Sequence, residues 1–280
     1  MASDGDSEHL APGAAETAPL DPTTPDPTPP ETDTADPADK ERQPMVPDGT
    51  RLYVVGDIHG CTDLLTQLHW LILDDAARHE VERKVVVYVG DYIDRGPDSK
   101  GVVDLLIDEP LPGFESIHLK GNHEQALLEF LDDIAIGPDW FSFGGVQTVG
   151  SYGMPAPDNI FDVAALEAAQ ATLKVTLPER HLRFYRDLRI GHLEGDFLMV
   201  HAGLRPDVPL QAQTANDLLW IREPFLTSDY NFGVIVVHGH TIAQEPQIRP
   251  NRIGIDTGAF HTGRLSCLVL QGTTIDFLQT

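Results

Sequence analysis

The stretch VVGDIHGCTDLL, residues 54–65, places Asp57 and His59 two positions apart, directly after an apolar, β-branched run. A glycine stands on each side of the pair, at positions 56 and 60. A tight turn with capping residues would explain this pattern, and so would two ligands of a metal ion. The rest of the chain decides between these two explanations.

The composition is that of an acidic chain with room for a sizeable core. The 280 residues are 41% hydrophobic, and 44 acidic against 19 basic side chains give a formal charge of −25. Such a field repels nucleic acids and anionic membrane surfaces, and no apolar run reaches the roughly 20 residues of a transmembrane helix. We therefore expect neither nucleic acid nor a membrane among the partners.

The location is expected to be cytoplasmic. The N-terminus has no basic segment followed by an apolar one, so we expect no secretory signal. Two cysteines, Cys61 and Cys267, make no disulfide framework, which favours a reducing compartment. The sequence does not determine the oligomeric state, and a monomer is the default expectation.

The acidity is concentrated near the N-terminus. Residues 1–50 contain 12 acidic and 2 basic side chains, 10 of the 22 prolines and few large apolar residues. Ordering such a segment cannot recover its conformational entropy. We therefore predict a disordered, acidic, proline-rich tail over residues 1–48 and a single folded domain over residues 49–280.

From residue 51 the chain alternates between β-branched apolar runs and helical patterns. Near-continuous apolar runs are typical of strands buried on both faces. The order strand, helix, strand, helix at the start predicts an α/β architecture. The expected strands are 51–55, 84–89, 116–119, 197–200, 233–237, 252–255 and 265–270, and the expected helices are 63–79, 99–109, 124–134, 163–173 and 178–188.

Five polar clusters follow predicted strands: GDIHG (56–60), GDYIDRG (90–96), GNHE (121–124), HAG (201–203) and HGHT (238–241). In open α/β sheets, loops at the carboxyl ends of strands converge even when they are far apart in sequence. The clusters offer carboxylate, amide and imidazole groups without thiolate, a set that suits Mn²⁺, Fe²⁺ or Zn²⁺. The candidate ligands are Asp57, His59, Asp91, Asn122, His201 and one or both of His238 and His240.

The number and order of these clusters favour metal ligands over a simple turn at Asp57 and His59. Each cluster alone is a weak signal, whereas GDxxDRG and the ordered set are specific. So many ligands exceed the needs of one catalytic ion. Two ions about 3.5–4 Å apart, bridged by one carboxylate, fit the count better.

The series D-x-H, G-D-x-x-D-R-G, G-N-H-E, H-A-G and G-H-T resembles the phosphoprotein phosphatase family of metallophosphoesterases, over residues 51–280. LLWIRE (218–223), IGIDTGAFHTGRLSCLVLQG (253–272) and FGGVQTVGSYG (143–153) are similar to its bacterial and bacteriophage members, typified by the bacteriophage lambda phosphatase. The resemblance implies a calcineurin-like sandwich of two mixed β-sheets flanked by α-helices, with the metals at the strand ends.

The resemblance also implies six metal ligands in two groups that share one carboxylate. They are Asp57 and His59 on the first metal, Asp91 between the two, and Asn122, His201 and His240 on the second. The expected cofactors are two divalent ions, Mn²⁺ in first place, with Fe or Zn as alternatives. The residues alone leave the choice between His238 and His240 open, and the resemblance favours His240.

Catalytic and phosphate-binding roles come from the same resemblance. His123 would be the general acid or would orient the leaving oxygen, and Asp94 would set its tautomer and raise its pKa. Arg95 and Arg222, together with Asn122, would bind the phosphate, because a guanidinium matches two phosphoryl oxygens. The alternatives are a turn cap at Asp94 and, for Arg222, a surface ion pair with its neighbour in the sequence.

These roles predict a phosphomonoesterase in which a metal-bridging hydroxide attacks phosphorus in line. We expect a protein serine/threonine phosphatase, with phosphotyrosine as a further substrate class and a phosphorylated protein or peptide as partner. The alternative is a hydrolase of symmetrical dinucleoside tetraphosphates or small phosphoesters. Such hydrolases look similar but resemble GNHD where this chain has GNHE, which favours the phosphatase. A non-catalytic phosphate-binding module is disfavoured because no metal position is missing.

Overall fold

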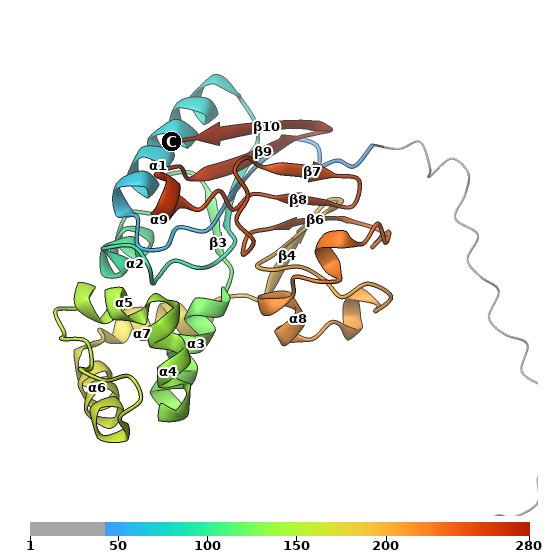
Figure 1. Cartoon of the computed structure of the whole chain (residues 1–280). Coiled ribbons are helices and arrows are strands. Elements are labelled where there is room, and N and C mark those ends of the chain that lie inside the picture. Colours follow the sequence, from blue (N-terminus) through green and yellow to red (C-terminus); the bar gives the residue numbers. More distant parts are fainter. Residues whose placement is uncertain (1–42) are drawn as a thin grey trace, which may run out of the picture. The chain divides into compact units, whose positions relative to one another are not determined.

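The computed structural model describes residues 43–280, so residues 1–42 of the predicted tail lie outside the described residues. The strands are β1 (Thr50–Val55), β2 (Arg83–Tyr88), β3 (Glu115–His118), β4 (Gly191–Glu194), β5 (Phe197–Val200), β6 (Ile235–His238), β7 (Gln247–Arg249), β8 (Arg252–Gly254), β9 (Ser266–Gln271) and β10 (Thr274–Gln279). They form a sheet of order β10-β9-β1-β2-β3 and a sheet of order β4-β5-β6-β8-β7 (Figure 1). Both sheets are mixed, since β1, β2 and β3 are parallel, as are β5, β6 and β8, while the outer pairs are antiparallel.

The two sheets share an apolar core. Their central strands alternate side chains between two apolar environments, as expected for strands that are buried on both faces. Leu52 and Val54 of β1 belong to the same buried cluster as Met199 of β5 and Val237 of β6. The alternate residues of β1 instead join a second cluster with the helices that cover the first sheet.

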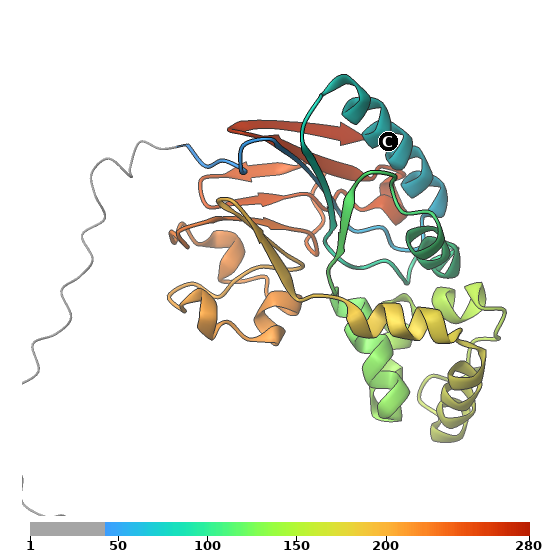
Figure 2. The same ribbon diagram turned by 180° about the vertical axis from the view of Figure 1, so that it is seen from behind.

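The helices are α1 (Thr62–Arg78), α2 (Ser99–Asp108), α3 (Asn122–Asp132), α4 (Gly137–Trp140), α5 (Val146–Ser151), α6 (Val163–Thr176), α7 (Glu179–Asp187), α8 (Ala215–Trp220) and α9 (Ala259–Thr262), with short 3₁₀ or π turns at Ile134–Ile136, Phe141–Gly145, Leu210–Ala212 and Phe225–Thr227. Helices α3 to α7 gather at one end of the domain in both views (Figure 1, Figure 2). No helix among residues 43–280 is long and apolar enough to cross a membrane. The predicted α/β fold with two mixed sheets and flanking helices is confirmed.

Three strands were not predicted from the sequence, and each lies at the edge of a sheet. They are β4, β7 and β10. Their residues are largely exposed or half-buried, so they lack the continuous apolar runs by which the central strands were predicted.

Residues 43–48 pack on the domain, which corrects the predicted tail boundary at residue 48. Val46 is fully buried in the core between the sheets, and its N–H donates to the carbonyl of Gly272 at 3.1 Å. The N–H of Met45 donates to the Asp196 carboxylate at 2.8 Å. One buried valine and three hydrogen bonds, including the Asp196 N–H to the carbonyl of Met45 at 3.0 Å, hold this segment on the domain, and its proline-rich composition does not reveal them.

Candidate metal centre

The candidate centre lies where the carboxyl ends of six strands from both sheets meet. Loops after β1, β2, β3, β5, β6 and β8 carry its residues, as expected for ligand sites in α/β sheets. Backbone hydrogen bonds tie these loops together. The N–H of His59 donates to the carbonyl of Asp91 at 2.8 Å, and the N–H of Gly239 donates to the carbonyl of His201 at 2.8 Å. The structure thereby brings all six predicted metal ligands into one place.

Asp91 stands between the two groups of ligands. Its side chain is buried, with Oδ2 at 3.5 Å from Nε2 of His59 and Oδ1 at 3.4 Å from Nε2 of His201. Two ligand atoms that are each about 2.1 Å from one ion and roughly at right angles lie about 3 Å apart. Because the two carboxylate oxygens face different imidazoles, Asp91 fits the bridging role.

The second group forms around Asn122. Its Oδ1 lies 2.8 Å from Nε2 of His201 and 2.9 Å from Nδ1 of His240. Potential ligand atoms of Asp91, His201 and His240 also lie within 4.8 Å of one another. Burial lowers the pKa of both histidines, so both imidazoles are neutral at pH 7 and can offer a lone pair.

Three candidate ligand atoms, two from the first group and one from the second, are unpaired in the protein interior. Oδ1 of Asp57, Nε2 of His59 and Nε2 of His240 are buried without a hydrogen-bond partner among residues 43–280. A buried polar atom without a partner is costly, and a divalent cation would satisfy all three. The donors present therefore fit a metal pair.

His123 also approaches the first group. It forms a cluster with His59 and Asp91 whose potential ligand atoms lie within 4.8 Å, whereas Asp57 is in neither cluster of this kind. Oδ2 of Asp57 instead accepts a hydrogen bond from the backbone N–H of His240 at 2.9 Å. Asp57 thus links the loops after β1 and β6.

Asp256 is a carboxylate of the centre that the sequence analysis missed. It is buried, its charge interacts with that of Asp57, and burial raises its pKa to about 6. Two buried carboxyls whose charges interact favour a shared proton or a bound cation. Asp256 directly follows the predicted strand 252–255, so the signal that identified the other ligands was also present here.

The structure separates His238 from His240. Strand β6 ends at His238, whose Nδ1 lies 3.0 Å from the carbonyl of Gly239 and whose ring packs edge-on against Phe225 with centroids 5.1 Å apart. His240 follows in a left-handed conformation with φ 62° and reaches Asn122. Only His240 therefore contacts the ligand groups.

Asp94 is a buried anchor for His123. Nδ1–H of His123 donates to Oδ2 of Asp94 at 2.7 Å, the indole N–H of Trp140 donates to the same oxygen at 3.1 Å, and the Thr148 hydroxyl donates to Oδ1 at 2.5 Å. Burial would lower the pKa of His123, but the carboxylates of Asp91 and Asp94 outweigh it and raise this pKa above its ordinary value. Asp94 is thus more than a turn cap: it fixes the ring and favours its cationic form.

The two predicted phosphate-binding arginines lie beside the centre in different settings. The Arg95 guanidinium is 5.1 Å from the centroid of the Phe260 ring, a cation–π contact. Arg222 is exposed, and its Nη2 donates to the carbonyl of His240 at 3.4 Å. Among residues 43–280 no ion pair joins Arg222 to Glu223, so the surface-pair alternative is not seen.

Aromatic side chains surround the imidazoles. Phe260 lies 5.4 Å from the ring of His59, Phe143 lies 6.3 Å from the ring of His123, and Trp220 lies 6.2 Å from Phe143. Phe143 and Phe260 are 39% and 37% exposed, although they are large and apolar. These aromatic side chains, the aromatic rim, form a partly open surface beside the centre.

Backbone strain is concentrated at the centre. Non-glycine residues rarely adopt positive φ, and they do so mainly where surrounding structure enforces it. Among residues 43–280 the non-glycine residues in this conformation are His59, Asp91, Asp94, Arg95, Asp207 and His240. All but Asp207 are predicted site residues, which indicates that the fold holds these side chains in a set arrangement.

The pattern of the calcineurin-like phosphoesterase family matches residues 50–250. The chain belongs to this family. The predicted metallophosphoesterase is thereby confirmed as a hydrolase with two divalent metals, and the residues above would hold them. Membership in the lambda phosphatase branch stays a prediction.

Similar proteins carry a more specific name. The asymmetrical bis(5′-nucleosyl)-tetraphosphatase PrpE of Bacillus mycoides is 25% identical over 236 residues, and that of Anoxybacillus flavithermus is 26% identical over 236 residues. Each alignment covers 77% of this chain and 88% of the relative. A crystal structure provisionally described as a diadenosine tetraphosphatase is 23% identical, covers 85% of this chain and 98% of that chain, and has a TM-score of 0.56. This last likeness shows the shared fold.

Proposed function

We propose that this protein hydrolyses dinucleoside tetraphosphates asymmetrically, to a nucleoside monophosphate and a nucleoside triphosphate. The names of the PrpE relatives support this activity, and they favour asymmetrical cleavage over the symmetrical cleavage that the sequence analysis held as its alternative. The observation that carries the proposal is the aromatic rim beside His123. A substrate with two nucleobases can stack on it, whereas a simple phosphoester cannot.

The side chains of the centre divide the work of hydrolysis. Two bound divalent ions would acidify water and neutralise phosphate charge. Arg95 and Arg222 offer donors to the phosphoryl oxygens from positions beside the ligands. His123 keeps Nδ1–H on Asp94, so its Nε2 can give a proton to the leaving oxygen. A positive local field explains how so acidic a chain accepts a polyanion.

Phosphoprotein hydrolysis is the second candidate, and the openness of the rim favours it. Phe143 and Phe260 are partly exposed, so a phosphorylated side chain on a polypeptide can approach the centre from solvent. The GNHE motif at 121–124 supports the same candidate by resemblance. Serine, threonine and tyrosine phosphates are all within its scope, and Mn²⁺ is the proposed metal.

A comparison of two substrates separates the candidates. Wild-type protein with Mn²⁺ is assayed on diadenosine tetraphosphate and on a phosphoserine peptide, with metal analysis of the same preparation. We expect a higher kcat/KM for the dinucleotide, with AMP and ATP as products. Two ADP molecules as products would refute asymmetrical cleavage. A higher kcat/KM for the peptide would establish the second candidate instead.

The variant Trp220→Leu tests the aromatic rim. Loss of one base–aromatic contact, worth roughly 1–3 kcal/mol, should lower kcat/KM for diadenosine tetraphosphate about tenfold. The same variant should hydrolyse p-nitrophenyl phosphate within about twofold of wild type, because this substrate has no nucleobase. Equal losses on both substrates would show that Trp220 supports the centre rather than the base.

A further inference from the structure

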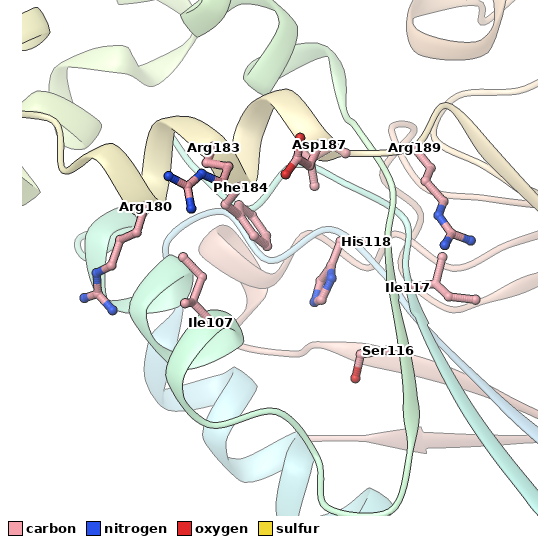
Figure 3. Close-up of a pocket in the computed structure, with 10 residues that line it drawn as sticks. Ile107, Ser116, Ile117, His118, Arg180, Arg183, Phe184, Asp187 and Arg189 are labelled. Atoms are coloured by element: carbon pink, nitrogen blue, oxygen red, sulfur yellow. The ribbon is translucent and has the colours of Figure 1, made fainter.

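A pocket that contains none of the metal-centre residues lies between the edge strand β3 and helix α7. Its volume is about 410 Å³, within the range of small-molecule sites. Ser116 and His118 of β3 line one side, and Arg183 and Phe184 of α7 line another, followed by Arg189 (Figure 3).

Three arginines and one carboxylate, Asp187, line this pocket, so its lining carries a net positive charge on a strongly acidic protein. The segment ERHLRFYRDLRI, residues 179–190, has an arginine at every third position from 180 to 189, although the chain has 19 basic and 44 acidic side chains. Arg180 is engaged by Asp104 and Asp108. The other two arginines of the pocket, Arg183 and Arg189, have only a weak ion pair or none within the described residues.

Arg183 and Arg189 have unused hydrogen-bonding capacity. Nη2 of Arg183 lies 3.6 Å from Oε1 of Glu179, and both side chains are exposed, so this ion pair is weak. The guanidinium of Arg189 has no ion pair or hydrogen bond among residues 43–280. Both arginines can therefore bind an anion without breaking a strong existing contact.

Aromatic and polar groups lie between these arginines (Figure 3). His118 stacks on Tyr88, with centroids 5.1 Å apart and ring planes 4° apart, and meets Phe184 edge-on at 5.2 Å. Within the described part of the chain, neither ring nitrogen of His118 has a hydrogen-bond partner. Burial lowers the pKa of His118 to about 4, so the ring is neutral at pH 7 and can both accept and donate.

We propose that this pocket is a nucleotide-binding site, separate from the metal centre, in which Arg183 binds phosphate, the neighbouring Phe184 contacts the base, and Arg189 adds positive charge at the other end. The free guanidinium groups suit phosphate oxygens, and the half-buried aromatic wall suits a planar, apolar ring. His118 and Ser116 provide polar groups for the base edge or the ribose. The site does not depend on the proposed activity of the metal centre.

The pocket wall also touches the loop that carries the bridging carboxylate. Phe184 lies 5.5 Å and His118 lies 6.3 Å from the ring of Tyr92, the residue after Asp91. The Tyr92 hydroxyl donates to the carbonyl of Leu119 at 2.7 Å, which connects this loop with the end of β3. Only the side chain of Phe184 or His118 therefore separates a nucleotide in the pocket from Tyr92, the neighbour of Asp91.

Calorimetric titration of the full chain with AMP tests the site. The measurement uses the Asp91→Asn background, in which the bridging ligand of the metal centre is removed. We expect a saturable AMP site that Arg183→Ala and Phe184→Leu each weaken about tenfold or more. Arg186→Ala removes the same charge from the same helix outside this pocket, and it should change binding less than about twofold.

Several outcomes would overturn the proposal. No saturable binding of AMP would do so, as would equal weakening by Arg183→Ala and Arg186→Ala, which indicates diffuse electrostatics. If inorganic phosphate competes as well as AMP, the base makes no contact and the assignment to a nucleotide is wrong. Because Phe184→Leu could disturb folding, Arg189→Ala serves as a second variant, and melting curves of all variants accompany the titrations.

Discussion

The substitution Gly239→Ala tests the position of Asp57 with a single methyl group. A Cβ at residue 239 would lie 1.9 Å from Oδ1 of Asp57 and 3.0 Å from a methyl carbon of Val89. Non-bonded carbon and oxygen atoms need about 3.2 Å, so the carboxylate oxygen must retreat by roughly 1.3 Å. The N–H of His240 holds the other oxygen of this carboxylate at 2.9 Å, so this retreat disrupts the centre.

The expected loss of activity follows from this displacement. Misplacing a catalytic group by about 1 Å costs on the order of 100-fold in rate, or about 2.7 kcal/mol of transition-state stabilisation. We therefore expect kcat/KM for p-nitrophenyl phosphate with saturating Mn²⁺ to fall about 100-fold, with weaker Mn²⁺ binding in a metal titration. Gly239 does not have a positive φ, so the effect comes from the methyl group and not from backbone strain.

Gly150→Ala is the matched control. A Cβ at Gly150, in helix α5, would meet no atom within 4 Å. Because alanine is the better helix former, this variant should keep its activity and melt at the same or a slightly higher temperature. Wild-type activity and Mn²⁺ affinity in Gly239→Ala would refute the reasoning, since Asp57 would then not be held against residue 239.

Four further predictions follow from the same structure. A chelator should abolish activity and Mn²⁺ restore it, and Asp91→Asn should fold yet be inert; turnover in metal-free protein would exclude the two-metal centre. His123→Ala should reduce kcat more for an alkyl phosphoester than for a substrate with an acidic phenol leaving group, and equal losses would rule out a general acid. His240→Asn should lower activity roughly 100-fold and His238→Asn less than about tenfold. A larger loss in His238→Asn would show that His238 is the metal ligand. Val46→Ala should lower the free energy of unfolding by about 2 kcal/mol in a denaturant titration with no change in kcat. An unchanged free energy of unfolding would show that residues 43–48 do not pack on the domain.

Much of the site was predictable because its residues sit at the ends of apolar strands. Asp57, Asp91 and His201 each follow a largely buried apolar strand, and Asn122 follows the half-buried strand β3. Strand identity and the convergence of carboxyl ends then bring them together by a general rule of α/β sheets. The kinds of metal that fit the site follow from the kinds of side chain available as ligands, and the sequence shows these directly.

Other parts of the site depend on contacts between residues distant in sequence. Trp140 and Thr148 hold Asp94 from the segment of α4 and α5, and no local pattern marks them as partners. His238 and His240 are both plausible ligands in the sequence, and the left-handed turn at His240 separates them.

By itself, the sequence determined the α/β class, the order of the central strands and helices, and the candidate ligands, because hydrophobic periodicity and motif spacing are local properties. Only the tertiary structure decided that Asp91 faces a different histidine with each oxygen, that Asp256 interacts with Asp57, and that residues 43–48 pack on the domain. These contacts join segments that are far apart in the sequence, such as Val46 and Gly272. They are set by the way two sheets pack on a shared core, which no single segment encodes.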